Sequence, residues 1–185
     1  MTDHPDPLTL DGEIIDAART GNVERLTRLL DDHPDKLHLK VPPYDASLLF
    51  PAAESGNVAA VDALLQRGLD VNYRETGDNT YALHWVAAQG NLAMARRLID
   101  AGGDVIGDGD DHAGGVIGWA TFWDGCDDDA HRAVVDLLIS HGARHHIFSA
   151  IAMNLADEVR RIVGGDPSAL NRRQSRNENH RTPLQ

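Results

Sequence analysis

The chain has 185 residues, 42% of them hydrophobic, and a formal net charge of -12. A chain of this length can bury a sizeable core, but its acidic balance argues against non-specific binding to nucleic acid, which needs a basic face. No apolar run approaches the roughly 20 residues of a membrane-spanning helix, so neither nucleic acid nor a membrane is an expected partner.

Cysteine and lysine usage indicates a cellular setting. Cys126 is the only cysteine, which excludes an intramolecular disulfide and suits a reducing cytoplasm. Lys36 and Lys40 are the only lysines, and this arginine bias is typical of a GC-rich bacterial gene. Residues 1–10 lack the basic region and apolar core of a signal peptide, and we expect them to form a loose N-terminal leader.

Hydrophobic periodicity predicts pairs of short helices along the rest of the chain. Gly21 stands between the first two helices, where a tight turn needs positive φ, and Gly68 and Gly102 follow second helices in the manner of C-cap glycines. In chain order the expected pairs are 13–19 with 23–30, 48–54 with 58–66, 82–89 with 92–101, 116–121 with 130–140, and 146–152 with 156–163.

The same frame of residues returns at a fixed period. The pairs Gly21-Asn22, Gly56-Asn57 and Gly90-Asn91 are separated by 35 and 34 residues. Each pair is preceded by small residues and followed by a Leu-Leu or Leu-Ile pair. Self-similarity at this period indicates a solenoid, because each repeat buries its apolar face against its neighbours.

The frame resembles the ankyrin repeat, whose signature is T-P-L-H-x-A on about 33 residues. Residues 82–87 (Ala-Leu-His-Trp-Val-Ala) fit that signature, residues 47–53 are a looser copy, and residues 181–185 nearly repeat it. The resemblance implies an all-α fold, an ankyrin-repeat solenoid of stacked helix-turn-helix units with divergent repeats. It also implies a structural role for His84, which would bridge neighbouring turns by hydrogen bonds.

The resemblance divides the chain into about five repeats plus the start of a sixth. Residues 171–185 are assigned to a linker and the start of a further, truncated repeat, so we expect the chain to be an excerpt of a longer protein. The five repeats are placed at 11–41, 42–75, 76–109, 110–143 and 144–170.

Repeats four and five depart from the period. Ile99 to Ile139 is 40 residues, which predicts a lengthened loop near 125–129 between the two helices of repeat four. Ile139 to Val163 is only 24 residues, so the loop that normally follows Gly142 is expected to be largely missing. Repeat five aligns on repeat one at an offset of 133, which suggests duplication of a four-repeat block.

No specific active-site motif is present, and we predict no catalytic residue, no metal site and no cofactor. Cys126 lies in an acidic loop that disfavours the thiolate. His141, His145 and His146 could contribute to a zinc site only with convergent partners, and a role at a helix end is favoured. Residues 107–111 lack the spacing of a calcium loop and are interpreted as an exposed turn.

A partner-binding surface is predicted on the concave face that ankyrin-like stacks present. Trp85 and Trp119 occupy equivalent places in successive repeats, and Phe122 and Trp123 put aromatic rings in polar positions, as at interface hot spots. The alternative is that Phe122 and Trp123 pack under the loop at 125–129. The predicted set consists of Trp85, Gln89, Trp119, Phe122, Trp123, Asp78 and His112.

Charge patterning suggests the chemistry of the partner. No lysine or arginine occurs between Arg97 and Arg132, a span that contains many aspartates. An acidic rim beside aromatic rings favours a protein with a basic surface, although a merely solvated surface is the alternative. The basic residues near the end, Arg172, Arg173, Arg176 and Arg181, could instead meet missing C-terminal repeats.

These observations favour a non-catalytic protein-binding module in the cytoplasm. Two alternatives stay open at this stage. One is an intramolecular regulatory or scaffold array of a longer protein. The other is a metal- or small-molecule-dependent enzyme that uses the insertion in repeat four. A fold of this kind does not by itself identify the partner.

Overall fold

The computed structural model describes residues 9–122, 126, 128–175 and 180–184. In these residues every regular element is a helix, and the only β-type pairing is an isolated antiparallel bridge between Val41 and Ala46. The all-α prediction is therefore confirmed. The chain divides into two compact units: unit 1 comprises residues up to 82 together with 100–103, and unit 2 comprises residues 83–99 and from 104 onward.

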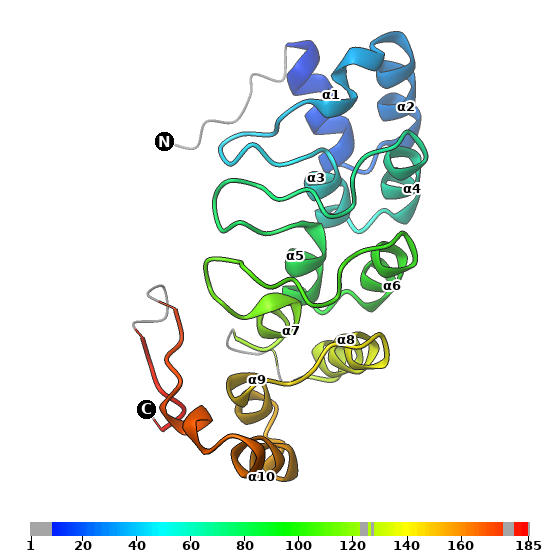
Figure 1. Cartoon of the computed structure of the whole chain (residues 1–185). Coiled ribbons are helices and arrows are strands. Elements are labelled where there is room, and N and C mark those ends of the chain that lie inside the picture. Colours follow the sequence, from blue (N-terminus) through cyan, green and yellow to red (C-terminus); the bar gives the residue numbers. More distant parts are fainter. Residues whose placement is uncertain (1–8, 123–125, 127, 176–179, 185) are drawn as a thin grey trace. The chain divides into compact units, whose positions relative to one another are not determined.

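Unit 1 contains two helix pairs arranged in two layers (Figure 1). One layer holds the first helix of each pair and the other holds the second, and each helix contacts its partner and its equivalent in the next pair. The elements are α1 (Leu10–Arg19), α2 (Val23–Asp32), the 3₁₀ helix η1 (Pro34–His38), α3 (Leu49–Glu54) and α4 (Val58–Gln66).

Neutral side chains begin three of the four α-helices of unit 1. The Thr9 hydroxyl accepts from the Gly12 amide at 3.1 Å, and the Asn22 side chain accepts from the Arg25 amide at 3.1 Å. Asn57 caps α4 in the same way. Such caps satisfy amides that have no partner within the helix, which stabilises a helix by about 1 kcal/mol.

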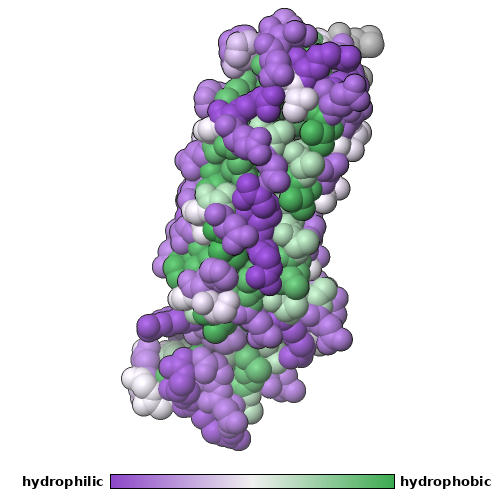
Figure 2. Space-filling view, turned by 90° about the vertical axis from the view of Figure 1, so that its right-hand side faces the viewer, coloured by the Kyte–Doolittle hydropathy of each residue, from purple (hydrophilic) through white to green (hydrophobic). Residues whose placement is uncertain are grey.

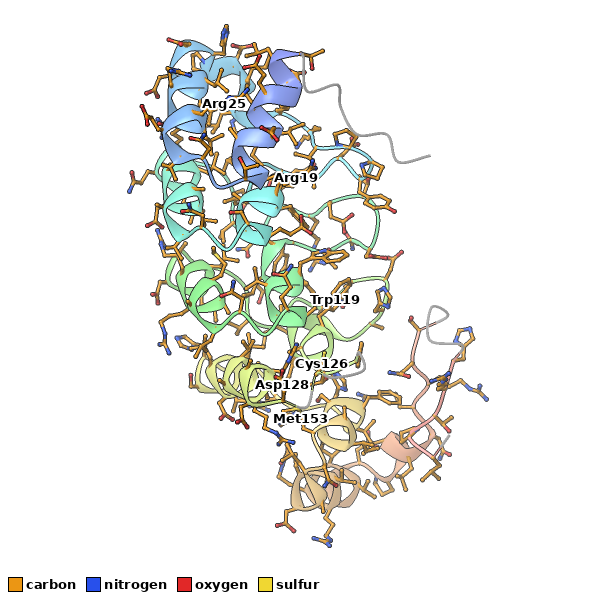
Figure 3. The ribbon with its side chains drawn as sticks, turned by 180° about the vertical axis from the view of Figure 1, so that it is seen from behind. Arg19, Arg25, Trp119, Cys126, Asp128 and Met153 are labelled. Atoms are coloured by element: carbon orange, nitrogen blue, oxygen red, sulfur yellow. The ribbon has the colours of Figure 1, made fainter. Side chains whose placement is uncertain are left out.

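Polar bonds also hold the helices of unit 1 together. The guanidinium of Arg25, on α2, lies 3.1 Å from Glu13 and 3.3 Å from Asp16, both on α1 (Figure 3). Asn57 donates to the carbonyl oxygen of Gly21 at 2.8 Å and so joins the two pairs. Gly21 has φ +66°, and a β-carbon there would lie 2.8 Å from Asn57 Cβ. Glycine is therefore required at position 21 because φ is positive and because a side chain there would collide with Asn57.

Unit 2 repeats the helix-turn-helix pattern with irregular connections. Its α7 is short and contacts α9, and α9 packs against α10. Its elements are α5 (Ala82–Ala88), whose first residue belongs to unit 1, α6 (Leu92–Asp100), whose last residue belongs to unit 1, α7 (Gly115–Trp119), α8 (Asp129–Ser140), α9 (Ile147–Ala152), α10 (Ala156–Gly165) and the 3₁₀ helix η2 (Pro167–Asn171).

The predicted helices are confirmed to within a few residues in all five pairs. The short connection after Gly142 is confirmed as well, because α9 begins at Ile147. Pro34 and Pro167, which match at the offset of 133, each begin a 3₁₀ helix. The division into repeats and the block duplication stay predictions. Of the loop predicted at 125–129, Gly125 and Asp127 lie outside the described residues, and Asp129 already begins α8.

The second helices of the pairs lie on one side in each unit. Figure 2 shows, for unit 1, the side that carries α2 and α4, where hydrophilic side chains interrupt the hydrophobic areas. The residues predicted to contact a partner come instead from α5, from α7 and from loops.

Candidate partner-binding surface

The loop before α7 is built around a buried carboxylate. Asp110 is 4% exposed, and its oxygens accept from the backbone amides of His112 at 3.0 Å, Gly114 at 3.2 Å and Gly115 at 2.7 Å. A fourth donor is the indole nitrogen of Trp119, at 3.0 Å. Buried charge is tolerated when it is fully hydrogen-bonded, and here it fixes the loop onto α7. The expectation that 107–111 is an exposed turn is therefore wrong for Asp110.

A similar carboxylate organises a loop of unit 1. Glu75 is also 4% exposed and accepts from the amides of Asp78 and Thr80, both at 3.0 Å, and from the Thr80 hydroxyl at 2.8 Å. It accepts from the Gly77 amide as well. Sequence reasoning missed both carboxylates, although their interval of 35 residues matches the period of the repeat.

Trp119 is an interior residue rather than a partner contact. Its side chain is 2% exposed, and its indole nitrogen is committed to Asp110. The prediction that Trp119 lies on the binding surface is therefore wrong, because the loop and α5 cover the ring. In Figure 3 Trp119 lies where the helices meet this loop.

Trp85 and His112 surround the buried indole and reach the surface. The ring of Trp85, from α5, lies 5.0 Å from that of Trp119, and the ring of His112 meets Trp119 edge-on at 5.1 Å. Both side chains are partly exposed, and Gln89, one turn after Trp85, is exposed. The expected proximity of Trp85 and Trp119 is confirmed. The structure thus brings Trp85 and His112 together and sets Gln89 on the same helical face.

Phe122 makes a different set of contacts. Its ring packs so closely on α7 that a β-carbon at Gly114 would lie 2.2 Å from the ring, and one at Gly118 2.7 Å. The His146 ring is 5.7 Å away. Phe122 is partly exposed, but it is seated on glycines rather than presented with Trp85. Trp123 lies outside the described residues.

Asp78 belongs to unit 1 and is described there alone. It is partly exposed in the loop that Glu75 organises, and its amide donates to that carboxylate. The exposed aromatic ring of this region is Tyr44, which is 54% exposed and lies against Gly77. Sequence reasoning did not select Tyr44, although an aromatic residue in a polar loop is a recognisable signal.

His84 has the structural role that the resemblance implied. It is fully buried, and its Nε2 lies 3.1 Å from the carbonyl oxygen of Gly107. Gly107 has φ +72°, and a β-carbon there would lie 2.7 Å from the His84 ring. The histidine therefore holds the loop before α7 against α5.

The remaining histidines are bound to nearby groups. His141 Nδ1 lies 2.9 Å from the Leu137 carbonyl oxygen, and His145 Nδ1 lies 3.1 Å from the Ser149 hydroxyl. His146 begins α9, where its Nδ1 accepts from the Ser149 amide at 3.1 Å. Burial lowers the pKa of His146 to about 4. The helix-end interpretation is confirmed for His146.

Side chains that could bind a metal ion are dispersed in the described part of the chain. No group of three or more His, Cys, Asp or Glu side chains is placed there to hold a metal ion. Cys126 is buried, so its thiol does not offer an exposed nucleophile. None of the described helices is both long enough and apolar enough to cross a lipid bilayer.

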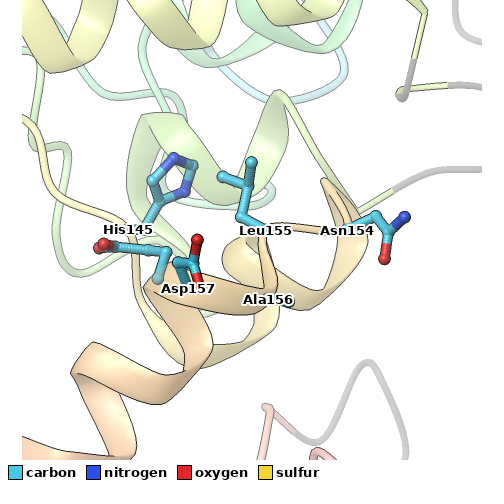
Figure 4. Close-up of a pocket in the computed structure, with 6 residues that line it drawn as sticks. His145, Asn154, Leu155, Ala156 and Asp157 are labelled. Atoms are coloured by element: carbon cyan, nitrogen blue, oxygen red, sulfur yellow. The ribbon is translucent and has the colours of Figure 1, made fainter.

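A pocket of about 570 Å³ opens in unit 2 where the chain turns from α9 into α10 (Figure 4). It is lined by His145, Leu155, Asp157 and Glu158, among others. Burial lowers the pKa of His145, and the two carboxylates pair with arginines of their own helix, Asp157 with Arg160 and Glu158 with Arg161. These pairs leave no converging set of groups aimed into the hollow.

The helix-turn-helix pairs and their Gly-Asn turns define an all-α repeat protein. A family model described as "Ankyrin repeats (many copies)" matches residues 49–99, from α3 into α6, and identifies this part of the chain as ankyrin repeats. These repeats generally mediate protein–protein interaction and are generally non-catalytic. No curated protein matches the chain.

Proposed function

We propose that this chain is a non-catalytic protein-binding module and that Trp85, His112 and Gln89 form the centre of its contact surface. The observation that carries the proposal is the arrangement around Trp119. A buried indole, locked by Asp110, supports two partly exposed rings 5.0 and 5.1 Å away. Aromatic side chains held rigidly in this way lose little entropy on binding and are frequent hot spots.

The surrounding charge favours a partner with a basic surface. Asp104, Asp108 and Asp111 are exposed along the loop that carries His112. Opposite charge across an interface accelerates association and selects the partner. Phe122 and Trp123 stay proposed contact residues of this surface, and Asp78 stays a separate proposed contact residue within unit 1. The single cysteine suits the bacterial cytoplasm that we propose as its location.

A second candidate function is an intramolecular array within a longer protein. It is favoured by the segment after η2, where the Gln174 amide donates to Arg181 at 3.0 Å and the His180 amide donates to Ser175 at 3.1 Å. A comparable bond closes the loop before α5, where the Glu75 amide donates to the Thr80 carbonyl oxygen at 2.9 Å, and Arg181 is exposed. If a further repeat covers the segment after η2, amide exchange at 180–184 should slow at least tenfold in a longer gene product. Unchanged exchange would reject this candidate.

The first test compares capture of partner proteins by variants of the whole chain. Trp85→Ala and Gln89→Arg should each lower capture of a partner from bacterial lysate at least tenfold, since the first removes an anchor ring and the second repels a basic surface. Gln66→Arg is the matched control, because Gln66 is likewise exposed at the end of a helix. Circular dichroism would establish that the variants are folded.

Equal capture by the folded variants and the control would contradict the proposed surface. Loss of capture in Gln66→Arg alone would move the site to unit 1. Turnover of a small molecule by the purified chain, at a rate that Trp85→Ala leaves unchanged, would favour an enzyme and contradict the binding function.

A further inference from the structure

The long loops of unit 1 cover one another. The Thr76 amide, in the loop before α5, donates to the carbonyl oxygen of Tyr44 at 2.7 Å, and Gly77 of that loop lies against the Tyr44 ring. At its base, the Asn72 side chain donates to Gly102 at 3.0 Å, and Val71 is only 8% exposed. Each loop thus relies on the following connection to bury its apolar base.

In unit 2 this covering loop is absent from the described chain between α8 and α9. Only residues 141–146 connect these helices, whereas residues 67–81 connect α4 and α5. The positions equivalent to Val71 and Asn72, 34 residues later, are Val105 and Ile106. Val105 is partly exposed and Ile106 is 42% exposed. Ile106 therefore has an exposed aliphatic side chain at the position where Asn72 of unit 1 has a hydrogen-bonded amide, and no long loop follows to cover it.

A pocket of about 300 Å³ marks this place. Val105, Ile106 and Ile117 supply its apolar lining, and Ile117 is 4% exposed. Gly142 lines it too, at the place where Gly102 receives the bond from Asn72 in unit 1. Its volume lies at the lower end of the range typical of ligand sites, about 300–1,000 Å³.

Charges of opposite sign flank the apolar lining. Asp108 comes from the loop before α7 and Arg144 from the short connection after α8, and both are exposed. An occupant that complements them carries a basic group, an aliphatic group and an acidic group in close succession. Three consecutive residues of an extended chain carry these groups: the middle side chain enters the pocket, and its two neighbours, which point to the opposite face, bend back to the exposed charges through long, flexible stems.

We propose that this pocket binds an extended peptide segment of a protein partner, with an aliphatic residue on Ile106 between a basic residue facing Asp108 and an acidic residue facing Arg144. The segment takes the place of the loop that repeat five lacks. This inference rests on the proposed protein-binding function, but its site is separate in residues from the Trp85–His112 surface.

The test is an NMR titration of the whole chain with the peptide acetyl-Lys-Ile-Glu-amide. We expect amide shifts at Ile106, Gly142 and Arg144 that saturate at millimolar peptide, and at least fivefold weaker binding of acetyl-Lys-Ser-Glu-amide. Ile106→Ser should weaken the first peptide at least fivefold. Ile139→Ser should leave its affinity unchanged and is the matched control, because Ile139 is 38% exposed on α8.

A charge reversal keeps the test independent of folding losses. Arg144→Glu should bind acetyl-Lys-Ile-Lys-amide more tightly than acetyl-Lys-Ile-Glu-amide, the reverse of the original chain. Trp85→Ala should keep its peptide affinity even where it loses the captured partner, which separates failure of this inference from failure of the proposed function.

Three results would overturn the inference. The first is the absence of saturable shifts up to about 10 mM peptide, a concentration on the order of the weakest affinities of interest. The second is that the shifts are confined to Trp85 and Gln89. The third is that Ile106→Ser and the original chain bind the peptide with equal affinity. Sedimentation that shows a dimer which the peptide does not dissociate would assign the pocket to a second copy of the chain instead.

Discussion

The two units join neighbouring helix pairs with different side chains. In unit 1 the neutral amide of Asn57 donates to Gly21 at 2.8 Å. In unit 2 the ring of His131 lies 3.1 Å from the Ala88 carbonyl oxygen and 2.7 Å from Asp128. Each ring nitrogen of His131 therefore lies close to an acceptor. An amide that joins two helix pairs makes the junction in unit 1, whereas in unit 2 an imidazole ring makes it and also contacts the residue that caps α8.

The side chains that cap the helices also differ between the two units. Thr9, Asn22 and Asn57 cap helices of unit 1, whereas Asp128 caps α8 and His146 caps α9 in unit 2. All of these side chains satisfy the free amides of a first turn. The side-chain caps of unit 1 are therefore neutral, whereas in unit 2 two caps ionise and a third, Asn91 at the start of α6, is neutral.

The largest expected effect is the loss of unfolding free energy when one of the two buried carboxylates, Asp110 or Glu75, is removed. Asp110→Ala should lower the free energy of unfolding by about 4 kcal/mol, because it leaves several buried donors without a partner. Glu75→Ala should cost less, about 3 kcal/mol, because the lost Thr80 hydroxyl contact can be replaced by water. Urea unfolding measures both. Trp85 fluorescence and partner capture should change only with Asp110→Ala, and a change with Glu75→Ala alone would contradict this comparison.

Alanine substitutions at Gly21, which lies against Asn57, and at Gly90, which lies against His131, should lower stability to different extents in the two units. Gly21→Ala places a methyl 2.8 Å from Asn57 Cβ, whereas Gly90→Ala meets the His131 ring at 3.1 Å. With φ of +66° and +64° both variants are strained, and we expect losses of about 3 and 2 kcal/mol. Gly68→Ala, at φ +92° with no atom within 4 Å, reports the strain alone. Equal melting temperatures for all three variants would show that the contacts are irrelevant.

The ionising cap of α9 should make stability depend on pH. The pKa of His146 falls from 6.5 to about 4 on burial, so the unfolded chain binds a proton that the folded chain does not. The neutral ring contributes stability above pH 6.5, and this is lost as the pH falls towards 4. We expect the loss to reach about 2 kcal/mol, allowing for partial solvation of the ring. His146→Asn should flatten the difference between pH 7 and 4.5 in urea unfolding, and an unchanged slope would refute the assignment.

The smallest effect concerns Asp128. Its pKa lies below the ordinary 3.8, chiefly because the backbone amide and then the ring of His131 donate to it. A depressed pKa gives stability that is present above pH 3.8 and lost as the pH falls through the folded value. Carboxyl ¹³C shifts followed against pH should show this low pKa and its partial return in His131→Ala. Titration of Asp128 at 3.8 or above in the original chain would contradict the contact.

The helix pairs could be predicted from the sequence because local signals agree. Gly21-Asn22, Gly56-Asn57 and Gly90-Asn91 place a turn and a cap together, and paired apolar residues follow at constant distance. The alignment then located the irregular fourth and fifth pairs from their intervals. The local turn and cap signals and the repeat period predict the same helix pairs, as is expected when the local preferences of a sequence agree with its fold.

The surface could be predicted only in part, because burial of polar groups depends on partners distant in sequence. In the sequence Asp110 resembles a solvated turn residue, but in the structure four donors converge on it. Trp119 resembles an exposed anchor, but its indole nitrogen donates a hydrogen bond to the buried Asp110 carboxylate. One signal was available but unused. Gly114, Gly118 and Phe122 follow at intervals of four, which places two glycines beneath an aromatic ring on one helical face.

The short connection at 141–146 has a consequence for engineering the chain. Repeat proteins are usually edited by adding, removing or exchanging whole units, because each unit contacts only its neighbours. Here the residues that end α8 pass almost directly into the cap of α9. A designer could cut cleanly on the regular side, within the neutral-capped pairs. The described segment from 128 to 171 would have to be moved as one piece, since so short a connection joins α8 to α9.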